Sequence, residues 1–144
     1  MNKILLFLIF IFNYSFCHVD QEALFNFEKK CMICHDTYKK NDLAPPVVAI
    51  NQIYIKKTKG DLLRAKKMIV SFLDNPSNKK ALMKPAIKIF GLMPKQNITK
   101  KEIEDFADVI LETDFEIPDW FDDHFKSHKL NLDHDDMHKK NGSL

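Results

Sequence analysis

The spacing of hydrophobic and polar residues predicts that most of the chain after residue 18 is helical. The clearest helix follows Thr99, because Thr99 and Glu102 have the spacing of a capping box, in which each side chain bonds the other residue's backbone N–H. The apolar residues of one helical face then recur every three or four positions: Ile103, Phe106, Ala107, Ile110 and Leu111. We expect this face to pack into a core.

Two earlier segments have the same helical spacing. One helix is expected to begin at Gly60-Asp61 and to end at Asn75-Pro76. Its expected core residues are Leu62, Ile69 and Phe72. Another helix is expected to begin at Asp20, which is a favourable N-cap residue. The apolar stripe of this first helix contains Leu24, Phe27, Cys31 and Cys34.

The apolar residues of the segment from Val47 to Ile55 fit neither the helical period nor the alternation of a strand well. It is rich in β-branched residues, which favour strands, but it lacks clean alternation and no similar segment could pair with it. We therefore interpret it as a packed loop. The predicted fold class is all-α, with no internal repeat.

The first seventeen residues resemble a secretory signal peptide. Met1-Asn2-Lys3 is a short positive region, and the apolar run from Ile4 to Phe12 is too short to span a membrane. We expect cleavage after Cys17, although Cys17 could instead be a lipidated first residue. The expected organisation is a signal peptide at residues 1–17, one domain at 18–113 and a C-terminal extension at 114–144.

The nearly balanced total charge hides two blocks of opposite sign. Residues 36–101 carry fifteen Lys or Arg and four Asp or Glu, whereas residues 102–123 carry ten acids and no Lys or Arg. Such blocks usually form solvated surfaces. Several lysines of the basic block flank the Met93-Pro94 pair: Lys79, Lys80, Lys84, Lys88 and Lys95.

Residues 31–35 read Cys-Met-Ile-Cys-His, the pattern that attaches a c-type haem covalently. On a helix Cys31 and Cys34 share a face, so both sulfurs can reach the vinyl groups along one porphyrin edge, and His35 can ligate the iron. The alternatives are a chance match, a redox disulfide or half of a zinc site. The last two normally need a βαβ surround or a second cysteine pair, and the sequence has neither.

Met93 is the favoured candidate for the second axial ligand. It stands in a Gly91-Leu92-Met93-Pro94 loop, where the glycine permits a sharp turn and the proline stiffens the backbone. A histidine and methionine pair is a common ligand set in cytochromes that transfer electrons. The competing candidates are Met68, Met83 and the histidines near the C-terminus.

Taken together, the Cys31–His35 motif, Ala44-Pro45-Pro46, Met93-Pro94 and the amphipathic helix after Thr99 resemble a class I cytochrome c over about residues 20–112. The resemblance implies an all-α domain wrapped around one covalently attached haem c, with the first and last helices crossing beside it. It also implies that the carbonyl of Pro45 or Pro46 accepts the Nδ1 proton of His35. No obvious glycine-rich loop follows the haem motif, and residues after Glu112 have no counterpart in the family.

The expected function is that of a periplasmic carrier of single electrons rather than an enzyme. We expect protein redox partners with an acidic docking surface, no nucleic-acid partner and no membrane span in the mature chain. Two alternatives are a haem subunit of a larger redox enzyme and a catalytic or ligand-sensing protein whose iron lacks the Met93 ligand.

The C-terminal extension divides into an aromatic part and a polar part. Residues 115–121 combine large apolar side chains with acids, so we expect them to pack back onto the domain. The polar part contains two pairs of histidines spaced for metal binding on a helix: His124, His128, His134 and His138. Its low apolar content favours an ordinary polar terminus instead.

Overall fold

The structure is a computed structural model that describes residues 19–37 and 43–121. The expected signal peptide with Cys17, and the four histidines after residue 123, lie outside the described residues. The described helices are α2 (Gln21–Lys30), α3 (Met32–His35), α4 (Val47–Thr58), α5 (Leu62–Asp74), α6 (Lys84–Phe90) and α7 (Lys100–Glu112). The described part of the chain contains no strand, so the all-α prediction is confirmed.

The predicted helix starts are confirmed, and each of them is stabilised by a local hydrogen bond of its N-cap side chain. The carboxylate of Asp20 accepts the N–H of Glu22 at 3.0 Å, and that of Asp61 accepts the N–H of Arg64 at 3.0 Å. In the capping box, Glu102 N–H donates to the Thr99 hydroxyl at 3.2 Å, and Thr99 N–H donates to the Glu102 carboxylate at 2.8 Å. These bonds satisfy backbone donors that a helix start otherwise leaves unpaired.

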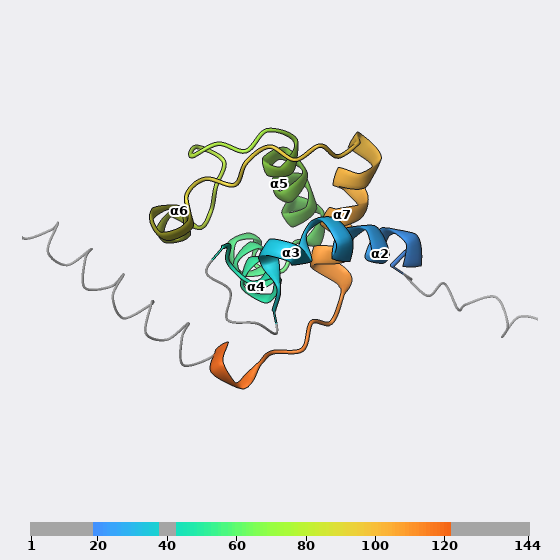
Figure 1. The fold of residues 1–144 in the computed structure, drawn as a ribbon, viewed down its shortest axis with the longest axis horizontal. Helices are drawn as coiled ribbons and strands as arrows, with labels where there is room; N and C mark the ends of the chain where they lie inside the picture. The colour runs from blue at the N-terminus through green and yellow to red at the C-terminus, as the bar shows by residue number, and fades with distance from the viewer. Residues whose placement is uncertain (1–18, 38–42, 122–144) are drawn as a thin grey trace, which may run out of the picture.

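The core forms where α2 and α5 pack against α7 (Figure 1). Phe27 of α2 meets Phe106 of α7 edge to face, with ring centroids 5.6 Å apart. The small side chain of Ala23, also buried, allows this close approach. Ile69 of α5 is buried as expected, but Leu62 is 48% exposed and its predicted core position is wrong. Leu62 is the first residue of α5, and its side chain faces solvent.

Helix α4 replaces the loop predicted for residues 47–55, so that prediction is wrong. Apolar residues occupy two sides of α4: Val47, Ile50 and Tyr54 line a cavity, while Val48 and Ala49 pack elsewhere. A helix with apolar residues on two sides lacks the single stripe that identifies an amphipathic helix. Burial on both sides therefore stabilises a helix that its β-branched composition does not favour.

The residues that cover Val48 and Ala49 come from the segment Thr113–Phe121, which we call the strap. It runs from the end of α7 past α4 (Figure 1, orange to red). Phe121 is 2% exposed, and Phe115 and Trp120 pack against the same cluster. The expectation that these aromatic residues pack back onto the domain is confirmed.

No helix among the described residues is long and apolar enough to cross a membrane.

Candidate functional site

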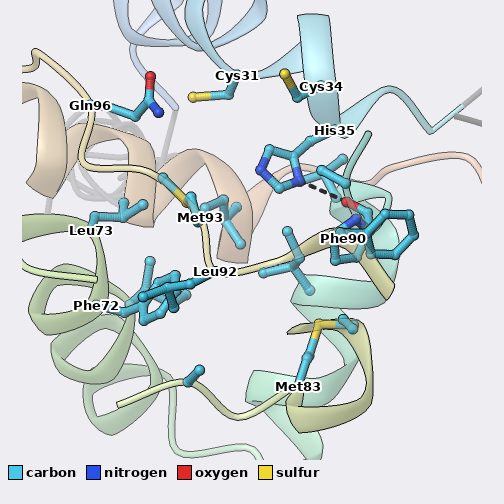
Figure 2. A pocket seen from close by; sticks show the side chains of 18 of the residues that line it. Cys31, Cys34, His35, Phe72, Leu73, Met83, Phe90, Leu92, Met93 and Gln96 are labelled. Carbon is cyan, nitrogen blue, oxygen red and sulfur yellow. Dashed lines mark hydrogen bonds between the residues drawn. The ribbon is translucent and has the colours of Figure 1, made fainter. Parts of the chain in front are cut away.

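An apolar cavity separates the α2–α3 end of the molecule from α6 and the residues that follow it. Its volume is about 210 Å³. Since a site of ~15 Å³ already holds one water molecule, the cavity has room for a much larger group. Cys31, Cys34 and His35 line one side, and Met93 lines another (Figure 2). The remaining walls are mainly aliphatic and aromatic, including Phe27, Ile69, Phe72, Ile87 and Phe90.

The two cysteines and the histidine lie on a single helical turn. Cys31 ends α2 and begins α3, and its carbonyl accepts the N–H groups of Cys34 at 3.1 Å and His35 at 2.9 Å. This turn brings both sulfur atoms and the imidazole to one end of the cavity (Figure 2). Cys31 is partly buried and Cys34 is exposed.

His35 is oriented by a backbone carbonyl. Its Nδ1 lies 2.7 Å from the carbonyl oxygen of Pro45. A carbonyl can only accept, so Nδ1 carries the proton and Nε2 keeps its lone pair for a metal. Burial lowers the pKa of His35, against an opposing effect of the Pro45 hydrogen bond, and this favours the neutral ring that a metal requires.

The carbonyl of Pro46 has a different role from that of Pro45. Pro46 is the N-cap of α4, and its carbonyl accepts the N–H groups of Ala49 at 3.0 Å and Ile50 at 3.3 Å. The two adjacent carbonyls thus form different hydrogen bonds. The Pro45 carbonyl orients His35, and the Pro46 carbonyl accepts the first hydrogen bonds of α4. Of the two prolines considered from sequence, Pro45 is the one that contacts the imidazole.

The three methionines considered as ligands differ in position. Met93 and the His35 ring lie on opposite sides of the same part of the cavity, whereas Met83 lies at the far end, near α6 (Figure 2). Met68 packs against the core and does not line the cavity. Gly91 has φ +81°, a conformation that favours glycine, and this turn directs the chain from α6 toward Met93.

Two polar residues of the cavity were not found from the sequence. Gln96 donates its side-chain N–H to the Pro94 carbonyl at 2.9 Å. Tyr54 is 6% exposed and lines the cavity. Burial raises the pKa of Tyr54 to about 12, so the phenol stays a neutral donor. Because Tyr54 belongs to the segment interpreted as a loop, no pattern indicated which way it points.

The cysteine environment bears on the alternatives to haem attachment. Burial raises the pKa of the Cys31 thiol to about 12, whereas redox-active cysteines are activated by a lowered pKa. Residues 19–37 and 43–121 contain no cluster of three or more His, Cys, Asp or Glu side chains placed to hold a metal ion. The raised pKa of Cys31 weighs against a redox-active thiol at this position.

The residues of the cavity fit a haem group. Two thiols stand at one end, a neutral imidazole and a thioether face each other, and the walls between them are apolar. The polar side chains of Tyr54 and Gln96 also line the cavity, where they could bond the polar edge of a bound group.

Comparisons with protein-family models, curated proteins and solved structures gave no match for this chain.

Proposed function

We propose that this chain is an exported monohaem c-type cytochrome of the class I type that carries single electrons between proteins. The observation that carries the proposal is the arrangement of the Cys31–His35 turn and Met93 around one apolar cavity. The proposal rests on this geometry together with the sequence motif.

The residues of the attachment turn have distinct roles in this proposal. Cys31 and Cys34 would hold the haem through thioethers, each formed by addition of its S–H across a vinyl double bond of the porphyrin. His35 would bind the iron through Nε2, and the Pro45 carbonyl holds the ring plane and increases the basicity of that nitrogen. Met93 would provide a second ligand through its sulfur. When bound, the haem supplies a reversible one-electron couple at iron.

The cavity walls contribute by excluding water. Aromatic and aliphatic side chains from α2, α5, α6 and α7 enclose the site, which keeps the local dielectric constant low. Tyr54 and Gln96 are the polar side chains that could bond the polar edge of the cofactor. The protein thereby sets the redox potential through ligands, hydrogen bonds and burial.

The surface around Met93 supports an acidic redox partner. Lys84 and Lys88 lie on α6, Lys95 follows Met93 by two residues, and all three are exposed. Lys80 differs, because it donates to the Ser71 carbonyl at 2.7 Å. Exposed lysines near the site of electron transfer would accelerate encounter with a negatively charged protein. The proposed location is the periplasm, after removal of residues 1–17.

The test is to export the full chain in a host that attaches haem to proteins. We expect a mature mass equal to residues 18–144 plus one haem, and a haem that resists extraction by acidified organic solvent. An added diacylglycerol on Cys17 would instead indicate a lipoprotein. A protein that leaves the host without covalent haem would contradict the proposal.

The axial ligand is tested by two methionine variants. The oxidised protein should show the weak near-infrared sulfur-to-iron charge-transfer band, and Met93→Ala should remove it while haem remains attached. Met83→Ala is the matched control and should retain the band. Absence of the band in the unmodified protein would favour the five-coordinate alternative, and its loss only in Met83→Ala would contradict the Met93 assignment.

A further inference from the structure

The helix that leads to Met93 has little support of its own, although Met93 itself is partly buried against the main core. We call residues 84–96, which comprise α6 and the Met93 loop, the methionine wall. Helix α6 has no buried residue, and Ile89 on it is 58% exposed. In Figure 1, α6 stands apart from the packed helices. The position of Met93 then depends on its own contact with the core and on whatever holds the start of α6 in place.

The strap lies close to the residue that immediately precedes this wall. Met83 is the N-cap of α6, and its side chain packs against the cluster formed by Phe121, Val48 and Ala49. Met83 also lines the cavity. It therefore lies at the junction of three parts of the molecule, namely the strap, α4 and the methionine wall.

The connection from Met83 to Met93 is short and partly rigid. Helix α6 has seven residues, so it spans roughly 10 Å at ~1.5 Å per residue. Gly91 caps it, with its N–H donating to the Ile87 carbonyl at 2.9 Å, and Met93 follows two residues later. A shift at the N-terminal end of α6 is thus transmitted to Met93 by a rigid element.

We propose that the strap positions the Met93 ligand, with Phe121 acting through Met83 and α6. This inference rests on the proposed function, because it concerns the bond from Met93 to haem iron. Phe121 is a positioning residue, since it belongs to the cluster against which Met83 packs and does not line the cavity. The competing interpretation is that the strap only covers the apolar back of α4.

The experiment measures how easily an added ligand displaces Met93. Imidazole is titrated into the oxidised, haem-loaded full chain, and the loss of the near-infrared band gives its apparent affinity. Phe121→Ala should raise that affinity by roughly tenfold, within the usual range for coupled sites, while haem stays attached and the band persists without imidazole.

Two control variants separate positioning from stability. Ile117→Ala changes an exposed strap residue, and Val109→Ala destabilises the buried core at a residue that does not line the cavity. Both should keep the imidazole affinity within about twofold of the unmodified protein, because neither side chain is part of the Phe121 cluster. If Phe121→Ala also stays within this range, the positioning role is overturned.

Two further measurements keep the test decisive. Met83→Ala should raise the imidazole affinity as Phe121→Ala does. The double variant that combines them should have an affinity close to that of either single variant. Full additivity of the two effects would show that Phe121 does not act through Met83. If Phe121→Ala does not accumulate, Phe121→Leu should give a smaller rise, and no rise would again overturn the role. An unmodified protein without haem or without the band would overturn the proposed function itself, a result distinct from equal affinities in the variants.

Discussion

The two sides of the cavity are held in place by different means. The attachment wall, which we define as residues 27–35 with Phe106 and Ile110 of α7, stands on the buried core and on the hydrogen bond from His35 to Pro45. The methionine wall has no buried residue in α6, and Met93 is only partly buried against the core. The proposed ligand His35 is therefore held by buried residues and a hydrogen bond, whereas the proposed ligand Met93 follows a helix with no buried residue.

The largest expected effect concerns the attachment wall. Replacing both Cys31 and Cys34 by alanine should abolish covalent haem attachment, because no other cysteine lines the cavity. Extraction with acidified organic solvent followed by a mass measurement provides the test. Ile33→Ala, between the two cysteines and 70% exposed, is the matched control and should retain the haem. Covalent haem in the double variant would refute the attachment site.

The difference in packing between the walls predicts unequal effects on stability. Phe106→Ala, in the core behind the attachment wall, should lower the free energy of unfolding by about 3–5 kcal/mol. Ile89→Ala on α6 should change it by about 0.5 kcal/mol or less, as is usual for exposed sites. Denaturant titration of both haem-loaded variants measures the two values. Equal losses would contradict the contrast between the walls.

The charges on the methionine wall predict a dependence on salt. Reversing the charge at Lys88 or Lys95 should slow electron transfer to an acidic partner by roughly tenfold at low ionic strength, since steering raises encounter rates by that order or more. This slowing should become smaller as the ionic strength rises, because exposed charges are screened over ~8 Å at physiological ionic strength. Stopped-flow rates at several salt concentrations provide the measurement. Equal slowing by reversal at Lys139 or Lys140 in the C-terminal tail would indicate that these lysines only maintain solubility.

The smallest expected effect is a pH-dependent change in the stability of the fold, caused by an ion pair at the attachment wall. The Glu102 carboxylate of α7 accepts from Lys30 of α2 at 2.5 Å and from Thr99 N–H, and these bonds lower its pKa from 4.5 to about 2. Because its pKa is lowered in the folded state, the Glu102 carboxylate stabilises the fold fully above its unfolded-state pKa. This stabilisation is lost as the pH falls through the folded-state pKa. Glu102→Gln should therefore be less stable than the unmodified protein at pH 7.

The same comparison has a defined pH window. The stability difference between Glu102→Gln and the unmodified protein should shrink as pH falls from about 4.5 to about 2. Glutamine can still serve in the capping box, so the variant isolates the charge. Denaturant midpoints across this range test the expectation. A difference that does not vary with pH would show that packing, rather than the carboxylate charge, is responsible.

The sequence predicted best those elements whose signals are local. Helix α7 was identified from its capping box and its apolar period, and α5 from its N-cap and its end at Asn75. In the candidate site, the Cys31–His35 turn needs only adjacent residues, and Pro45 was one of two prolines considered. For each of these, the determining contacts lie within about ten residues of one another.

The sequence could not predict features that depend on distant contacts. Helix α4 was missed because Val47 and Val48 face different surroundings, the first the cavity and the second the strap. The position of Tyr54 on the cavity wall was missed for the same reason, since the direction of its side chain follows from the helix. The link between Phe121 and Met83 joins residues 38 positions apart and has no sequence pattern.

The absence of buried residues in α6 has a consequence for amide hydrogen exchange. Amide protons in α7, whose side chains form the core, should exchange only when the whole domain unfolds. Those of α6, such as the Gly91 N–H that bonds the Ile87 carbonyl, should exchange through a local opening that leaves the core intact. The molecule would then contain two cooperative units, and if Met93 binds iron as proposed, haem loading should raise the free energy of opening the smaller unit.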